Sequence, residues 1–333
     1  MKAAYYERYG SADVLEIRDV ARPEPKDNEI LVQVFATTVT TADWRFRASE
    51  FPGILWPAGR AMAGLLRPKV NVLGSEFAGR VVAKGKDVTK FKGGDEVFGF
   101  SIAMGANAEY IAIAEDAPVA RKPVNLGYDE AAAVPFGAQS ALSFLRDFAR
   151  VGPGQKVLIA GASGGVGVWA VQIARHLGAE VTAVTSTGNM DLVRSLGADH
   201  IIDYKTQDYA ATGETWDLIL DTAGTTDFPH AQRALKPNCI FLPVEFNGRE
   251  ILQALRSAIF GGKRVKIGIS SDSQESLTWL AGLLEKGDIR PVIDSHYSLE
   301  RIADAHRRVE SRHKRGSVVV TVSPLALSMH KAE

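Results

Sequence analysis

A glycine-rich segment in the middle of the chain limits the possible folds more than any other feature. Residues 156–178 read KVLIAGASGGVGVWAVQIARHLG, in which an apolar, β-branched run at Lys156–Ala160 enters a turn of small residues. A helix is predicted directly after the turn, because apolar side chains recur at the spacing of one buried helix face. The free N–H groups and partial positive charge of a helix N-terminus suit a pyrophosphate. The turn residues assigned to cofactor binding are Ala162, Ser163, Gly164, Gly165 and Val166.

The residues after this turn alternate between strand-like and helix-like runs. Strands are predicted at Glu180–Ser186, His200–Tyr204, Asp217–Gly224, Cys239–Phe246 and Val265–Ser270, with helices at Asn189–Leu196 and Phe228–Leu235. This alternation is typical of a doubly wound parallel sheet, whereas the alternative, a strand–turn–helix that binds nothing, needs no such series. Gly164 and Gly165 would let the backbone approach the phosphates, and Gly167 would let the helix pack close to the strand.

Composition excludes several classes of protein. Lysine plus arginine and aspartate plus glutamate both total 39, so no global charge attracts nucleic acid or an anionic membrane. No apolar run approaches the ~20 residues that span a bilayer, and the N-terminal MKAAYYERYG lacks the apolar core of a secretory signal. The single cysteine, Cys239, excludes an intrachain disulfide and is expected to be a buried thiol. We therefore expect a cytoplasmic protein without a membrane partner.

Length and pattern predict two domains. The 333 residues exceed one typical domain, and residues 1–123 hold short alternating runs separated by Gly, Pro and Asp. We predict a first domain from residues 1–123 and 271–333, and a dinucleotide-binding domain from residues 124–270. Strands are predicted in the first domain at Ile30–Ala36, Phe77–Gly85, Asp95–Phe100, Ala108–Ile113, Pro291–Tyr297 and Ser317–Val322, helices at Gln274–Lys286 and Leu299–Arg312, and a loose tail at Ser323–Glu333.

Residues 51–70 form an apolar and basic insertion within the first domain, with Trp56, Leu65 and Leu66 beside Arg60 and Arg67. One interpretation is a surface helix that packs on its own domain. The other is a lid over a substrate cleft, because long irregular insertions often serve as lids.

Several motifs together resemble one family over nearly the whole chain. They are Met1-Lys2-Ala3, Tyr9-Gly10, Val39-Thr40-Thr41-Ala42-Asp43, Leu73-Gly74-Ser75-Glu76-Phe77-Ala78-Gly79, Gly93-Gly94-Asp95-Glu96-Val97-Phe98-Gly99, Ala131-Ala132-Ala133-Val134-Pro135, Leu196-Gly197-Ala198-Asp199, Ile202-Asp203-Tyr204 and Arg315-Gly316-Ser317. Their order and spacing resemble the medium-chain dehydrogenase/reductase superfamily, in its zinc-free quinone oxidoreductase (zeta-crystallin-like) branch. The resemblance implies an α/β protein with a Rossmann doubly wound parallel sheet and a β-rich GroES-like catalytic domain.

The resemblance also argues against a catalytic metal. Zinc alcohol dehydrogenases of the superfamily bind zinc through thiolate and imidazole ligands. Thr40 stands where their first cysteine ligand would be, and Ser75 stands where their histidine would be. The stretch Pro135–Ala141, around their third ligand, has no cysteine, and the four-cysteine structural lobe is missing. We therefore expect no metal site, and we interpret the seven histidines as surface or capping residues.

Without a metal, the chemistry implied by the resemblance is hydride transfer from NADPH to a quinone or an α,β-unsaturated carbonyl. The oxyanion or enolate that results needs a hydrogen-bond donor and then a proton. The catalytic candidates are Thr40, at the position of the family's asparagine, and Asp43, which matches the motif aspartate. A structural role for Asp43, as a partner of Arg45 or Arg47, is the alternative. No tyrosine follows the motif closely, so we expect no dedicated proton donor.

Cofactor choice depends on the end of the second Rossmann strand. An acidic residue there would bind the ribose 2′-hydroxyl, but Thr185–Asn189 contains none, and this favours NADPH over NADH. Ser186 and Thr187 are expected to take the 2′-phosphate, with Tyr204 and Lys205 completing the pocket. The remaining residues assigned to cofactor binding are Ser140, near the nicotinamide, and Ala223, Gly224 and Arg315.

Other functions stay open beside the leading one. A zinc-free alcohol dehydrogenase is a second enzyme reading, and a cofactor-binding protein with a structural or RNA-binding role is the alternative from another class. The basic run Arg307–Arg315 would be its RNA contact, although such a run is more often a solvated helix face or a contact to a cofactor phosphate. The resemblance implies a small-molecule substrate rather than nucleic acid as a partner. Because relatives are often dimers that extend the Rossmann sheet edge to edge, it also implies a homodimer paired at Cys239–Phe246 and Val265–Ser270.

Overall fold

The structure is a computed structural model that describes residues 1–323. The tail predicted at Ser323–Glu333 therefore lies outside the described residues, apart from Ser323. The chain divides into two compact units, and each is described by itself. Unit 1 contains residues 1–51, 56–139 and the chain from Asp272 onward, and unit 2 contains Pro52–Leu55 and Ser140–Ser271.

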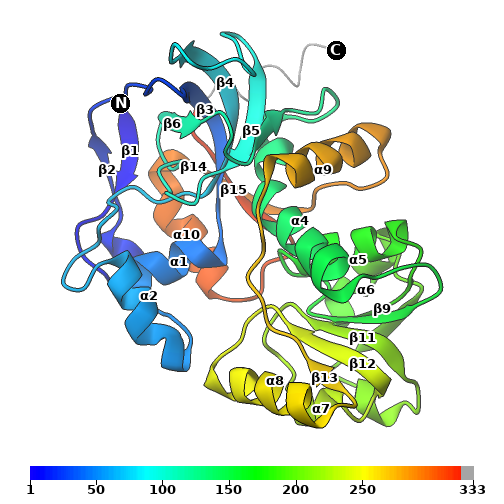
Figure 1. Cartoon of the computed structure of the whole chain (residues 1–333). Helices are drawn as coiled ribbons and strands as arrows, with labels where there is room; N and C mark the ends of the chain where they lie inside the picture. Colours follow the sequence, from blue (N-terminus) through cyan, green and yellow to red (C-terminus); the bar gives the residue numbers. More distant parts are fainter. Residues whose placement is uncertain (324–333) are drawn as a thin grey trace. The chain divides into compact units, whose positions relative to one another are not determined.

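Unit 2 is built on a six-stranded parallel sheet, and the predicted doubly wound class is confirmed. The strand order is β10-β9-β8-β11-β12-β13, and the order reverses between β8 and β11, where sheets of this kind bind ligands. Helices α5 and α6 cover one face and α7 and α8 the other (Figure 1). The elements are β8 (Lys156–Ala160), α5 (Gly167–His176), β9 (Glu180–Thr185), η4 (Thr187–Asn189), α6 (Met190–Ser195), β10 (His200–Asp203), η5 (Tyr209–Ala211), β11 (Trp216–Asp221), α7 (Phe228–Ala231), β12 (Leu235–Pro243), α8 (Gly248–Phe260) and β13 (Arg264–Val265).

The structure corrects the prediction at the far edge of this sheet. The helix predicted at Phe228–Leu235 ends at Ala231, and Leu235 already belongs to β12, where it pairs with Trp216 of β11. The strand predicted at Val265–Ser270 is only Arg264–Val265. The N–H of Lys266 still donates to the carbonyl oxygen of Phe241 in β12 at 3.0 Å, and the chain leaves the sheet after it. Lys266 Nζ donates to the carbonyl oxygen of Phe148 at 2.8 Å, and Gly268 lies against the Phe148 ring.

Unit 1 is built on a seven-stranded sheet of order β14-β15-β3-β4-β5-β7, with β6 also paired to β3. The pairing of β14 with β15 is parallel, and the others are antiparallel. Val318 of β15 lies opposite Val39 of β3, so the C-terminal segment returns to complete the N-terminal sheet. The strands are β3 (Glu29–Val39), β4 (Glu76–Lys84), β5 (Glu96–Phe100), β6 (Tyr110–Ala114), β7 (Val119–Arg121), β14 (Ile293–Ser298) and β15 (Ser317–Thr321), beside a separate pair, β1 (Lys2–Tyr5) and β2 (Glu16–Asp19).

Helices surround the unit 1 sheet. Helix α9 has the predicted bounds, whereas the helix predicted at Leu299–Arg312 is a short turn, η6, followed by α10. Residues 124–139 group with unit 1 because α3 packs against β3 and β4, and the domain boundaries predicted at 123 and 270 stay a prediction. The helical elements are η1 (Ala12–Val14), α1 (Thr41–Ala48), η2 (Gly53–Leu55), α2 (Trp56–Ala63), α3 (Tyr128–Ala132), α4 (Pro135–Leu142), η3 (Ser143–Ala149), α9 (Gln274–Lys286), η6 (Leu299–Arg301) and α10 (Ile302–Glu310).

Each unit has a core of its own. Ile30, Val32, Phe77 and Val97 belong to one buried cluster between the strands of unit 1. Leu158, Ile219, Trp216 and Phe241 belong to another in unit 2. Among the helices of residues 1–323, none is long and apolar enough to cross a membrane.

Candidate functional site

The glycine-rich turn joins β8 to α5 at the carboxyl end of the parallel sheet. The N–H of Ala162 donates to the carbonyl oxygen of Val184 at 3.1 Å, and the N–H of Gly164 donates to that of Gly161 at 2.9 Å. These bonds fix the turn against β9. The first N–H groups of an α-helix have no partner within the helix, so the start of α5 offers donors and a partial positive charge to a phosphate.

Two glycines of the turn are required by close contacts. A Cβ atom at Gly167 would lie 2.1 Å from the carbonyl oxygen of Gly161, so α5 packs closely against the turn that follows β8. Gly161 has φ +75°, and a Cβ atom there would lie 2.6 Å from the Cβ of Ala223. A Cβ atom at Gly164 would meet only the carbonyl oxygen of Gly161, at 3.3 Å. The fold therefore needs Gly161 and Gly167 more than it needs Gly164, whose open face is left for a ligand.

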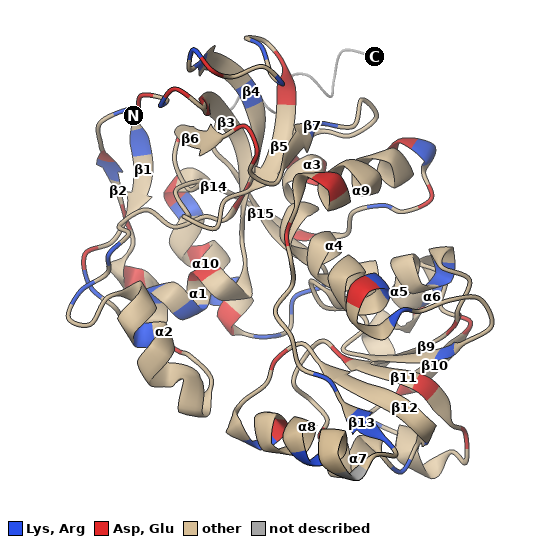
Figure 2. Cartoon of the chain, viewed as in Figure 1, with Lys and Arg blue, Asp and Glu red and all other residues tan. Residues whose placement is uncertain are grey.

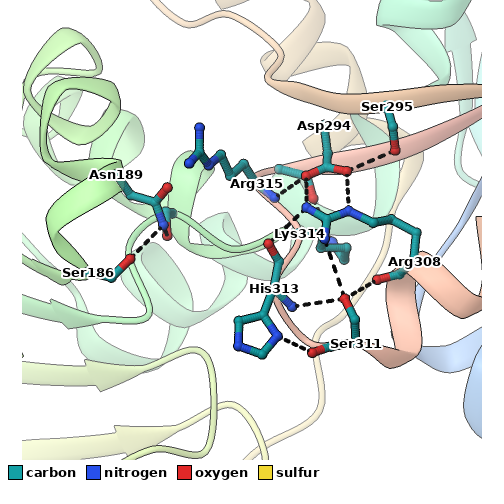
Figure 3. Close-up of polar contacts among 11 residues, drawn as sticks. Ser186, Asn189, Asp294, Ser295, Arg308, Ser311, His313, Lys314 and Arg315 are labelled. Carbon is teal, nitrogen blue, oxygen red and sulfur yellow. Dashed lines mark hydrogen bonds and ion pairs between the residues drawn. The ribbon is translucent and has the colours of Figure 1, made fainter. Parts of the chain in front are cut away.

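Polar side chains from the end of β9 gather beside the turn. Thr185 Oγ1 and Asn189 Nδ2 each donate to Ser163 Oγ at 3.0 Å. Asn189 Nδ2 also lies 3.2 Å from Ser186 Oγ (Figure 3). The side-chain oxygen of Asn189 is buried without a hydrogen-bond partner. Because such an acceptor costs stability until a donor satisfies it, Asn189 is a candidate for a ribose hydroxyl, which the sequence analysis missed.

An aspartate that the cofactor prediction left out holds Thr187. Thr187 Oγ1 makes a short hydrogen bond to Asp203, and the N–H of Lys205 donates to the same carboxylate at 3.0 Å. The bonds from Thr187 and Lys205 hold the pKa of Asp203 below its ordinary value. Asp203 therefore stays charged beside the residues expected to take a 2′-phosphate. It lies opposite Thr185 in the β9–β10 ladder, so a search along β9 alone could not find it.

The end of β11 forms the third side of this site. Buried Asp221 accepts hydrogen bonds from the N–H groups of Ala223 and Thr226, both at 3.0 Å. Burial raises the pKa of Asp221, although these N–H donors oppose the shift. Gly224 follows with φ +65°. The carboxyl edge of the sheet thus brings together Ala162–Val166, Ser186, Thr187, Tyr204, Lys205, Ala223 and Gly224, while Ser140 is buried on α4.

In unit 1, the two catalytic candidates form the capping box that starts α1. Thr40 Oγ1 donates to Asp43 Oδ2 at 2.7 Å and accepts from the N–H of Asp43 at 3.2 Å. The carboxylate of Asp43 also accepts from the N–H groups of Thr40, at 2.7 Å, and Gly74, at 2.9 Å. Burial raises the pKa of Asp43, and these bonds oppose the shift. Of the two alternative partners of Asp43, Arg45 and Arg47, the second is ion-paired with Glu310. An oxyanion would therefore compete with Asp43 for the single hydroxyl proton of Thr40.

Glu76 is a buried carboxyl that the sequence analysis quoted without giving it a role. It makes a short hydrogen bond with Thr38 Oγ1, and it accepts from the N–H of Phe136, in the first turn of α4, at 2.6 Å. Burial raises the pKa of Glu76 to about 7, despite the opposing bonds and the charge of Lys314. Burial also lowers the pKa of Lys314 to about 8. Glu76 therefore ties β4 to the start of α4, the helix that carries Ser140.

The positions of the family's zinc ligands offer only hydroxyl groups. Thr40 caps α1, and Ser75 Oγ is buried without a hydrogen-bond partner. Within residues 1–323, no group of three or more His, Cys, Asp or Glu side chains is placed to hold a metal ion. Because zinc sites in proteins are built from thiolate, imidazole and carboxylate ligands, the residues present do not fit that metal.

Two arginines of the basic run Arg307–Arg315 are ion-paired within unit 1. Arg308 makes two bonds to Asp294, at 2.7 and 2.6 Å, and the N–H of Arg315 donates to the same carboxylate at 2.8 Å (Figure 3). Arg307 bonds to Asp304 at 2.7 Å and to Asp13. These contacts favour a structural role for the run over nucleic-acid binding. The side chain of Arg315 is exposed, and its role toward a cofactor stays a prediction.

One histidine and the cysteine differ from expectation. His306 is fully buried, and neither ring nitrogen has a hydrogen-bond partner, so burial lowers its pKa to about 3. It is a core residue rather than a surface or capping residue, because it lies on the face of α10 that is buried together with Ile302, Ala305 and Val309. Cys239 is only half-buried, and its Sγ lies 3.8 Å from Asp217 Oδ1.

Comparison with known proteins finds dehydrogenase and reductase relatives along most of the chain. Residues 26–124 match the alcohol dehydrogenase GroES-like domain, and residues 196–320 match the zinc-binding dehydrogenase family. The 2-methylene-furan-3-one reductase of Solanum lycopersicum is 31% identical, over 97% of this chain and 80% of that protein. The chloroplastic NADPH-dependent alkenal/one oxidoreductase of Arabidopsis thaliana is 29% identical, over 97% and 80%. The quinone oxidoreductase structure from Coxiella burnetii has a TM-score of 0.86 at 27% identity and covers 97% of this chain and 99% of that one.

Proposed function

Since the chain belongs to the quinone oxidoreductase branch of the medium-chain dehydrogenase/reductase superfamily and is an oxidoreductase, we propose that it reduces a quinone or an α,β-unsaturated carbonyl with NADPH and without zinc. The observation that carries the proposal is the turn before α5, with its close approaches at Gly161 and Gly167. Relatives that are named for both acceptor classes support the choice of substrate.

The residues of unit 2 fit a pyridine nucleotide. The start of α5 would hold the pyrophosphate, and the unpartnered oxygen of Asn189 would accept from a ribose hydroxyl. A bound reduced nicotinamide supplies the hydride for the reaction. The chain supplies orientation, which can account for about 7–11 kcal/mol of a barrier in favourable cases.

The preference for NADPH depends on two opposite charges. Lys205 would attract a 2′-phosphate, whereas the carboxylate of Asp203 would repel it. Lys205→Ala should weaken NADPH binding by about 10- to 100-fold and leave NADH nearly unchanged, because it removes a charge-assisted bond. Asp203→Asn should strengthen NADPH alone. Titration of both cofactors by fluorescence measures the effects, and equal losses for the two cofactors in Lys205→Ala would contradict the assignment.

For unit 1, we propose that Thr40 donates a hydrogen bond to the oxygen of the acceptor as negative charge develops there. The hydroxyl would rotate away from Asp43, which keeps the N–H donors of Thr40 and Gly74. Asp43 would then act by positioning Thr40. No side chain is assigned as the proton donor, so solvent supplies the proton that completes reduction.

Two acceptors test the proposed activity. Purified protein should oxidise NADPH with 9,10-phenanthrenequinone or with a short enone, and prolonged chelation should leave the rate unchanged. Cofactor binding without turnover on either acceptor would favour a non-catalytic binding role, and turnover of simple alcohols that survives chelation would favour a zinc-free alcohol dehydrogenase. One zinc per chain, with activity lost on chelation, would refute zinc independence. A homodimer and a cytoplasmic location also stay proposals, to be tested by sedimentation and by imaging of the tagged chain.

A further inference from the structure

Helix α2 and the loop after it carry an unusual share of the exposed apolar surface. Fourteen large apolar side chains are exposed among the described residues, and five of them fall between residues 56 and 70. The loop tip is the most prominent part, because Leu65 and Leu66 are 68% and 94% exposed. The name α2 surface is used for Trp56, Met62, Leu65, Leu66 and Val70 together with Arg60, Arg67 and Lys69. Exposed apolar side chains concentrated in one short segment are a better sign of an interaction site than exposed residues scattered singly.

The loop that presents the tip is fixed rather than loose. Tyr9 Oη donates to the carbonyl oxygen of Gly64 at 2.7 Å, and Arg60 Nε donates to that of Leu65 at 2.9 Å. The Arg60 guanidinium also stacks on the Tyr9 ring, 3.7 Å from its centroid. Lys69 closes the loop from the other side through a 2.8 Å bond to the carbonyl oxygen of Ala61. The two leucines are therefore held outward at little entropic cost to binding.

The charge around the tip has one sign. Between Phe51 and Ser75 the chain has three cations, Arg60, Arg67 and Lys69, and no Asp or Glu, although the whole chain is neutral. Figure 2 accordingly shows blue and no red on α2. Glu7 is the acidic side chain in electrostatic reach of Arg67, and it is ion-paired with Arg18 at 2.7 Å. Within residues 1–323, the tip thus has apolar side chains flanked by Arg67 and Lys69, which make no ion pair.

We propose that the α2 surface docks the protein onto anionic lipid bilayers, with Leu65 and Leu66 entering the headgroup boundary and Arg67 and Lys69 on the phosphates. Apolar insertion and a basic flank are the two contributions that stable but reversible interfacial binding needs. The cations of the α2 surface are complementary to the negative charge of lipid phosphates. A second copy of this chain has no net charge, so we favour the lipid surface as the partner. The proposal does not depend on the reductase activity, and it would revise the expectation that the protein has no membrane partner.

Co-sedimentation of the full chain with vesicles tests the proposal. The protein should bind vesicles of equal parts phosphatidylcholine and phosphatidylglycerol, bind phosphatidylcholine alone weakly, and be released by high salt. Arg67→Gln should lower the partition coefficient about fivefold, the effect of one cation near an anionic surface. The double variant Leu65→Ser/Leu66→Ser should lower it at least about tenfold, because two apolar side chains no longer leave water. Thermal melting should stay unchanged, since all three side chains are exposed.

The matched control is Leu252→Ser/Leu255→Ser on α8, where the side chains are 54% and 59% exposed beside charges of both signs. It should bind vesicles like the unmodified chain. Equal loss in this control would mean non-specific adsorption and would overturn the proposal. Unchanged vesicle binding by the Leu65/Leu66 variant, or a change in its oligomeric state, would also overturn the proposal. A higher KM for the acceptor without any change in vesicle binding would overturn it too and would assign the segment to a substrate lid.

Discussion

Replacing Gly167 by alanine tests the packing that holds the turn before α5. The added Cβ would lie 2.1 Å from the carbonyl oxygen of Gly161 and 2.8 Å from Ala162 Cα, where ordinary contact begins at 3.4 Å. Helix and turn would have to separate by about 1 Å, and neither contacting group is a side chain that could rotate away. Overpacking of this kind costs about 1–3 kcal/mol and sometimes more, whereas alanine in a helix gains at most about 1 kcal/mol over glycine. Because Gly167 is the first residue of α5, that helix-interior gain largely does not apply, and we expect a net loss of about 1–3 kcal/mol.

Cofactor affinity should fall together with stability in Gly167→Ala. The N–H groups at the start of α5 would move by about 1 Å relative to the turn, and each hydrogen bond that is lost costs about 0.5–1.5 kcal/mol net. Calorimetry should show a melting temperature lower by several degrees, at roughly 2–4 °C per kcal/mol. Isothermal titration should show NADPH binding at least about tenfold weaker.

The matched control is Gly282→Ala, in the interior of α9, where a Cβ atom would meet nothing within 4 Å. That variant should gain up to about 1 kcal/mol from its higher helix propensity and bind NADPH normally. If Gly167→Ala matched it in both stability and affinity, the close approach of α5 to the turn would be irrelevant to folding and to the cofactor.

Two further substitutions separate structural from chemical roles in unit 1. Thr40→Val should cost about 0.5–2 kcal/mol of stability through the lost helix cap and should lower kcat/KM by about 10- to 1,000-fold through the lost oxyanion donor. Thr40→Ser should restore both. A Thr40→Val variant that is less stable but keeps full turnover would show that Thr40 acts only as a helix cap. Glu76, whose pKa burial raises from 4.5 to about 7, keeps its proton in the folded state where the unfolded chain has lost it. The stability of the unmodified chain relative to Glu76→Gln should therefore fall by up to about 3 kcal/mol as pH rises from about 4.5 to 7, and urea titrations that give a constant difference would show that Glu76 ionises normally.

The local sequence pattern was sufficient to predict those helices, strands and turns whose determining residues lie close together in the chain. The β8–turn–α5 unit and α9 follow from apolar period, glycine placement and caps such as Ser273, which accepts from the N–H of Ser276. Contacts between distant segments could not be found in this way. Asp203 meets Thr187 only because β10 pairs with β9, and Glu76 meets the N–H of Phe136 across 60 residues of chain. Histidine is a polar residue that the sequence alone suggests is exposed, and only the packing of α10 buries His306.

The pairing of β15 with β3 delays completion of the first sheet during synthesis. During synthesis β3 leaves the ribosome early, but Val318–Thr321, which pair with Ala36–Val39, come about 280 residues later. All six strands of the second sheet are complete by Val265, so that sheet can assemble while Ala36–Val39 of β3 still lack their β15 neighbour. An unpaired strand edge invites other chains to pair with it. A nascent or truncated chain that lacks β15 would therefore expose the edge of Ala36–Val39 to aggregation, although the sheet of unit 2 could already be folded.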